Sequence, residues 1–137
     1  MGTSQRLAWL RRVLLLKVVL CFAAWGLPAL LAPPQVLAWF GLTMPEDPLF
    51  LRLFGALAMT MGVAYWYAYQ DPVKNASIVK VGVVDNALAT LTVLLVAFTG
   101  GVSSWFVWVS AALTALFCVA LVAWMPREPG GWRAGPR

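Results

Sequence analysis

The sequence predicts an all-α integral membrane protein that crosses the bilayer four times, and three observations predict it. First, 62% of the 137 residues are hydrophobic and 11% are charged, with a mean hydropathy of +0.82. A soluble domain carries about a quarter charged residues, so this chain lacks the side chains to cover a water-facing surface. Second, four windows approach the roughly 20 apolar residues that a helix needs to cross a hydrocarbon core of about 30 Å. Third, prolines or paired glycines mark the ends of these windows.

We expect the first span over residues 13–31, where Lys17 is the only charged residue. Pro33 and Pro34 close this span, and Pro28 is expected to kink or end its helix. A cleaved signal peptide is the alternative, because three arginines precede the apolar run. The run is longer than the about 7 to 15 residues of a signal core, which favours the span.

Residues 35–42 are too few to cross the bilayer. Trp39 and Phe40 lie between prolines in this stretch, and amphipathic rings prefer the membrane interface. We therefore expect a short helical turn on the outer surface of the membrane.

The other three spans are expected over residues 49–69, 78–98 and 105–125. The second contains only Arg52 as a charge, the third contains a lysine and Asp85, and the fourth contains none. Small side chains recur along each span, and close contact of small residues is what drives helices together in lipid. Short connections then favour an up-down-up-down four-helix bundle, with residues 1–137 forming a single membrane domain.

Basic residues fall on one side of this arrangement. Nine of the ten would lie at the N-terminus, around the second connection and in the C-terminal tail: Arg6, Arg11, Arg12, Lys17, Lys74, Lys80, Arg127, Arg133 and Arg137. By the positive-inside rule both termini are cytoplasmic, and residues 126–137 form a flexible cytoplasmic tail. The predicted location is a bacterial inner membrane, with several passes through it.

Asp85 is the residue most in need of an explanation. Counted from residue 78 at about 1.5 Å per residue, it lies roughly 10 Å inside the membrane, where a carboxylate costs about 2.5 to 3.5 kcal/mol. Lys17 is offset from it by about 5 Å along the membrane normal, within reach of a lysine side chain. Arg52 is about 15 Å away, which makes direct pairing with Asp85 less favourable.

Two interpretations of these residues remain open. In the functional one, Asp85 forms a proton, ion or ligand site with Asn86, Thr90 and Tyr65, and Arg52 guards its outer mouth. In the structural one, Asp85 is neutral or forms an ion pair with Lys17 and fixes how the first and third helices meet. Taken alone, Lys17 is expected to extend to the inner interface.

The sequence contains none of the common catalytic, metal-binding or phosphate-binding motifs. There is no histidine, phosphate-binding glycine loop, nucleophile elbow, metal-ligand cluster or pair of carboxylates within a span. We therefore predict no catalytic residues, metal site or cofactor. The net charge of +5 is distributed as topology requires, which is not the pattern of a nucleic-acid-binding patch.

Three segments resemble the small four-helix bacterial membrane proteins grouped as DoxX-like and BphX-like. They are the loop 42–48 with the preceding Trp-Phe-Gly, the Leu-Arg-Leu-Phe-Gly run at 51–55, and the aromatic run 62–69 followed by Asp-Pro. The resemblance covers the first three spans and reaches no catalytic residue. Some DoxX-like relatives are small subunits of quinone-linked oxidoreductases, which implies a partner rather than a complete enzyme.

Three functions follow as hypotheses. The first is a non-enzymatic accessory or structural subunit of a larger membrane complex, in contact with membrane lipids. The second is a bundle that binds or transports a small apolar molecule or lipid, with its polar site around Asp85. The third is the small subunit of a quinone-linked oxidoreductase. The sequence does not set the oligomeric state.

Overall fold

The fold is all-helical in a computed structural model that describes residues 2–126. The elements, in chain order, are α1 (Thr3–Leu20), a π-helix (Cys21–Gly26), α2 (Leu27–Leu31), α3 (Pro34–Trp39), α4 (Leu49–Gln70), α5 (Ala76–Phe98) and α6 (Trp105–Trp124). No strand occurs within residues 2–126. The tail expected over residues 126–137 lies outside the described residues except for Pro126.

Four helical stretches are long and apolar enough to cross a membrane, as predicted. They run over Thr3–Leu31, Leu49–Gln70, Ala76–Phe98 and Trp105–Trp124. The first begins ten residues before the expected span at 13–31, because the arginines ahead of the apolar window are good helix formers and continue the helix. The other helix boundaries agree with the predicted span boundaries to within two residues.

Pro28 does not end the first helix, which continues to Leu31. A π-helix occupies the six residues before α2, and its last bond runs from the Leu27 N–H to the Phe22 carbonyl, five residues back. A proline in a regular α-helix clashes with the carbonyl four residues earlier and removes a donor. The wider π turn just before Pro28 changes this carbonyl spacing, so the helix absorbs the proline without stopping.

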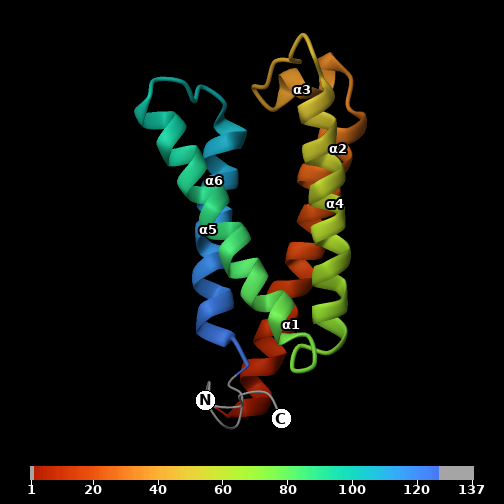
Figure 1. Ribbon diagram of the computed structural model, residues 1–137, viewed down its shortest axis with the longest axis vertical. Coiled ribbons are helices and arrows are strands. Elements are labelled where there is room, and N and C mark those ends of the chain that lie inside the picture. The colour runs from red at the N-terminus through yellow and green to blue at the C-terminus, as the bar shows by residue number, and fades with distance from the viewer. Residues whose placement is uncertain (1, 127–137) are drawn as a thin grey trace, which may run out of the picture.

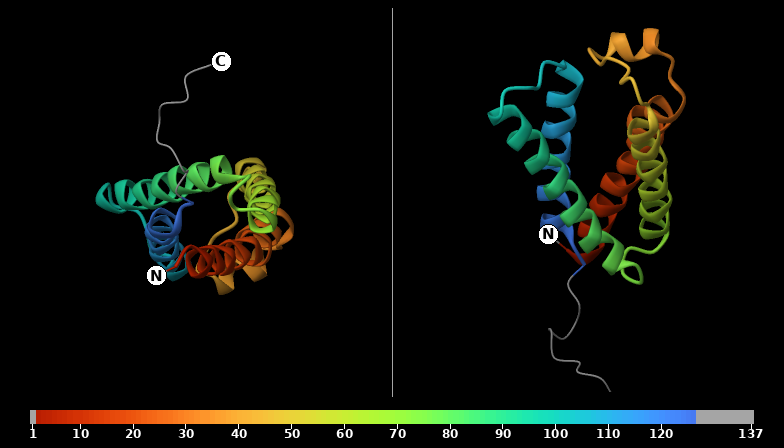
Figure 2. Two further views of the ribbon diagram at one scale, coloured as in Figure 1. Left: turned by 90° about the horizontal axis from the view of Figure 1, so that it is seen from below. Right: turned by 45° about the horizontal axis from the view of Figure 1, so that its top comes forward.

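The helices pack as two antiparallel pairs (Figure 1). The stretch α1 to α2 lies along α4, and α5 lies along α6. Contacts between the pairs are fewer and come mainly from α1 with α6 and from α4 with α5. Figures 1 and 2 show the pairs close together where α5 begins and separated at the end that carries α3.

Gly55 sets the distance between α2 and α4. A Cβ atom added at Gly55 would lie 2.6 Å from the Leu30 backbone nitrogen and 2.8 Å from the Gly26 carbonyl oxygen. The two backbones are therefore in direct contact, which only glycine permits. Small residues at helical spacing on the second span had predicted this kind of contact.

The first turns of α1 hold the ends of two other helices. Arg6 donates to the Ala123 carbonyl at the end of α6 (2.7 Å), and Arg11 donates to the Gln70 carbonyl at the end of α4 (3.4 Å). The last carbonyls of a helix have no partner within the helix and carry partial negative charge, so a guanidinium stabilises them.

The segment expected at residues 35–42 forms the short helix α3, followed by a turn at Gly41 with φ of 67°. This segment is attached to the start of α6, because the Ser104 hydroxyl donates to the Phe40 carbonyl (2.7 Å) and the Phe40 ring packs edge-on against Phe106. The α3 segment therefore connects the two helix pairs at the end where they diverge.

Candidate functional site

A chain of hydrogen bonds links the charged residues between the helices. The Lys17 ammonium on α1 donates to Asn86 Oδ1 on α5 (2.6 Å), and Asn86 Nδ2 donates to the Tyr65 hydroxyl on α4 (3.3 Å). The Tyr65 hydroxyl in turn donates to Asp85 Oδ2 (3.0 Å). Every donor in this chain points from the ammonium towards the carboxylate, so each bond polarises the next. We call these four side chains the polar chain.

Lys17 is enclosed rather than extended towards the interface. Its exposed fraction is 3%, and its Nζ lies 4.8, 5.6 and 5.0 Å from the ring centroids of Trp25, Tyr65 and Phe117. Aromatic faces within about 6 Å attract a cation, more strongly when water is excluded. Trp25 lies two helical turns further into the span, so the lysine side chain runs inward. This corrects the expectation that Lys17 alone reaches the inner interface.

Asn86 occupies the centre of the polar chain because of its neighbours on α5. Its Nδ2 also donates to the Gly82 carbonyl one turn earlier (2.6 Å), which fixes the amide. Gly82 leaves room for the Tyr65 ring, since an added Cβ there would lie 2.7 Å from Tyr65 Cε1. Both Asn86 and Tyr65 have no exposed surface.

Asp85 is half-buried and receives the Tyr65 hydroxyl. The expected ion pair would join it directly to Lys17, but the contacts found among the described residues place Asn86 and Tyr65 between the two charges. The opposite charges thus lie in one network and are bridged by two neutral groups. A buried charge is tolerated when hydrogen bonds and an opposite charge compensate its lost hydration.

Hydroxyl groups extend this network to α6. Thr90 donates to the Asn86 carbonyl (2.9 Å), and its oxygen lies 2.8 Å from the hydroxyl oxygen of Thr114 on α6. Closer to α3, Trp25 Nε1 donates to the Ser110 hydroxyl (2.9 Å). Sequence reasoning missed the Trp25–Ser110 bond. Its available signal was the spacing of Ser110 and Thr114, four residues apart on one face of an otherwise apolar span.

Arg52 stands apart from the polar chain. Its guanidinium donates to the carbonyls of Ala29 (3.0 Å) and Ala32 (3.1 Å), at the end of α2. In a continuing helix the Ala29 carbonyl would accept from residue 33, but Pro33 has no N–H. Arg52 therefore supplies donors that the prolines after α2 lack, and its observed contacts are those of a helix cap.

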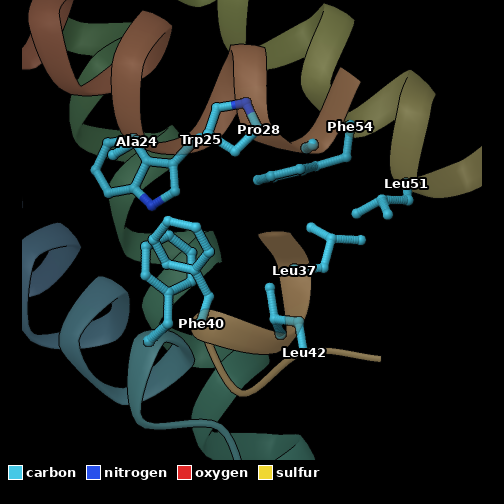
Figure 3. A pocket seen from close by; sticks show the side chains of 10 residues that line it. Ala24, Trp25, Pro28, Leu37, Phe40, Leu42, Leu51 and Phe54 are labelled. Atoms are coloured by element: carbon cyan, nitrogen blue, oxygen red, sulfur yellow. The ribbon is translucent and has the colours of Figure 1, made fainter. Parts of the chain in front are cut away.

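A small apolar cavity of about 50 Å³ lies beneath the α3 segment (Figure 3). Figure 3 shows Trp25 and Pro28 on one side of it and Leu37 and Phe40, from α3 and its following turn, on the other. Phe54 of α4 and Phe106 of α6 complete much of the wall. All of its lining side chains are carbon-rich, so its natural contents are apolar groups.

The described residues supply partners for their own buried polar side chains. Within residues 2–126 no buried side-chain nitrogen or oxygen lacks a hydrogen bond. The same part of the chain contains no group of three or more metal-ligating side chains. Of the residues predicted to form a site, Asp85, Asn86, Thr90 and Tyr65 come together, and Arg52 does not join them.

Comparison of the chain with protein-family models, curated proteins and solved structures found no match.

Proposed function

We propose that this chain is a non-enzymatic integral membrane protein of a bacterial inner membrane, which serves as an accessory or structural subunit of a larger membrane complex. The observation that supports it is the polar chain, whose four side chains bond to one another across α1, α4 and α5. Side chains that use their hydrogen-bonding groups on one another fix the positions of the helices that carry them, which is the role expected of a structural subunit.

The proposed topology is up-down-up-down with both termini in the cytoplasm. Two features support it. The helices are joined at alternating ends (Figure 1). Five of the seven described basic residues lie at the end where α1 begins, while Lys17 is buried between the helices and Arg52 caps α2 at the opposite end. The positive-inside rule assigns such an end to the cytoplasm.

The proposed contact with a partner uses the apolar outer faces of the helices. Large side chains are exposed along α4, including Phe50 (79%) and Leu57 (65%), and Phe98 at the end of α5 is 87% exposed. In a bilayer these faces contact lipid or another helix. In lipid there is no hydrophobic driving force between helices, so a partner helix would associate with these faces through van der Waals contact between complementary surfaces.

Gentle extraction of the full chain in a mild detergent, followed by native mass spectrometry, tests this proposal. Stable association with further protein subunits is expected. A bare chain that remains monodisperse under conditions that preserve known membrane complexes would contradict it. Asp85→Asn and Asp85→Leu serve as paired variants. If Asp85 has a structural role, each variant should lower the yield of the folded complex, while the complex that forms should contain the same subunits.

A second function, binding of a small apolar molecule or lipid, is favoured by the cavity beneath α3. This cavity lies by Trp25, whereas the half-buried carboxylate expected to orient a ligand is Asp85 at the far end of the polar chain. A molecule retained on the parent chain and lost from Ala24→Phe, which would fill the cavity, is the expected result. Equal retention by both chains would exclude this cavity. The quinone-linked hypothesis depends on sequence resemblance alone and stays a prediction.

A further inference from the structure

One end of the molecule is strongly basic. Five cationic side chains of the described residues lie where α1 and α5 begin and where α4 and α6 end: Arg6, Arg11, Arg12, Lys74 and Lys80. Among residues 2–126, Asp71 is the carboxylate in this region. At the opposite end, the loop after α3 carries Glu46 and Asp47, and Arg52 is committed to the α2 carbonyls.

Arg11 is held by a contact with α4, and Arg12 by the Trp9 ring of its own helix. Arg11 uses one N–H on the Gln70 carbonyl, and a guanidinium has five N–H donors, so most of its donors remain for another acceptor. Arg12 lies over the Trp9 ring at 4.8 Å, and Trp9 stacks on Trp124 with ring centroids 5.9 Å apart. A cation fixed by its neighbours loses less conformational entropy on binding than a free side chain.

Asp71 offers little neutralisation to a ligand. Its Oδ1 already accepts the backbone N–H groups of Val73 (3.2 Å) and Lys74 (3.0 Å), within the turn between α4 and α5. Lys74 itself is exposed. It lies one short turn after Gln70, whose carbonyl accepts from Arg11. Arg11 and Lys74 therefore flank the end of α4 on the basic side of the molecule.

We propose that Arg11 and Lys74 bind the headgroup of an anionic phospholipid. Charge complementarity supports this occupant, because a planar guanidinium suits phosphate oxygens and a lysine adds a point charge. Helices α4 and α5, on either side of Lys74, are long enough to span a bilayer, which puts the end of α4, where Arg11 binds the Gln70 carbonyl, at the level of the headgroups. Among the described residues this region has five cationic side chains and one carboxylate, so the additional cation of a zwitterionic lipid would be repelled.

Native mass spectrometry of the full chain, mixed with equal amounts of phosphatidylglycerol and phosphatidylcholine in a mild detergent, tests the proposal. The parent chain is expected to retain phosphatidylglycerol preferentially. Each removed charge should lower that preference by about fivefold, since a basic residue near an anionic surface contributes on the order of 1 kcal/mol. Arg11→Gln with Lys74→Gln should therefore lower it by more than about tenfold.

Three controls separate headgroup binding from other effects. Arg11→Lys with Lys74→Arg keeps both charges and should keep the preference, although the Arg11 bond to the Gln70 carbonyl changes. Glu46→Gln changes the net charge at the opposite end and should leave the preference unchanged. Lys74→Gln alone alters an exposed turn residue, so it reports on binding if the double variant fails to fold. Equal retention of both lipids by the parent, or an unchanged preference in the Gln variants, would overturn the proposal.

Discussion

Asn86→Leu tests whether the polar chain compensates a buried charge. Leucine is close to asparagine in size, but it removes the acceptor that lies 2.6 Å from the Lys17 ammonium. Since Lys17 is 3% exposed, water cannot readily replace that acceptor. Leaving a buried hydrogen-bonding group without its partner costs about 1 to 3 kcal/mol, and more for a charged group, and the three aromatic rings around the ammonium offset part of this. We expect the free energy of unfolding to fall by about 3 kcal/mol.

The size of the expected loss in the free energy of unfolding distinguishes Asn86→Leu from the loss of an ordinary hydrogen bond between neutral groups. Neutral hydrogen bonds between helices in a membrane contribute about 0.6 kcal/mol on average. The double variant Lys17→Met/Asn86→Leu removes the charge as well as its acceptor, and it should recover most of the loss, because apolar groups replace a buried polar pair at little cost. The coupling energy between the two positions should be at least about 2 kcal/mol.

Reversible unfolding by SDS in mixed micelles, followed by tryptophan fluorescence, measures these free energies. Ala89→Leu, at an exposed position on α5, is the matched control and should stay within about 0.5 kcal/mol of the parent. A cost of about 0.6 kcal/mol or less for Asn86→Leu, or a double variant as unstable as the sum of the two single ones, would refute the reasoning.

Three further predictions use the same unfolding measurement. Gly55→Ala should lower stability by about 1 to 3 kcal/mol because its Cβ meets the α2 backbone, whereas Ala56→Leu on the exposed face should have little effect; equal effects of the two would contradict the close contact. Arg52→Met should cost about 2 kcal/mol by leaving two carbonyls without donors, and Arg52→Lys should cost less; a neutral Arg52→Met would show that water caps α2 instead. Asp85→Leu should be less stable than Asp85→Asn by about 1 kcal/mol, because only asparagine keeps an acceptor for the Tyr65 hydroxyl; the reverse order would contradict that bond.

The sequence predicted which residues of neighbouring helices lie at matching heights better than it predicted the direction in which their side chains point. Bilayer thickness fixes the length of an apolar run, and the rise per residue then gives each charge a depth. On that basis Lys17 and Asp85 were expected within reach of each other, and they do share one network. The acceptor of Lys17 is nevertheless Asn86, the next residue, which lies about 100° further around the helix. Rotation about the axis depends on packing at Gly82 and Tyr65, which depth alone does not specify.

Backbone compensation was the other part that sequence reasoning missed. Pro28 was expected to kink or end its helix, but a π-helix adjusts the turn before it. Arg52 was expected near a ligand opening, but it donates to the Ala29 carbonyl, whose helical donor would have been Pro33, and to the Ala32 carbonyl after α2. The cost of an unpaired carbonyl in an apolar environment explains both results, since any nearby change that restores hydrogen bonding is favoured.

The central claim is that the chain crosses the membrane four times with its basic end in the cytoplasm. Single cysteines at Glu46, Lys74 and Ser103, in a Cys21→Ala/Cys118→Ala background, test it through labelling with a membrane-impermeant maleimide. The positions at Glu46 and Ser103 should react in intact cells, and the position at Lys74 should react only after permeabilisation. Labelling of Lys74→Cys in intact cells, or recovery of the chain in the soluble fraction without detergent, would contradict the claim.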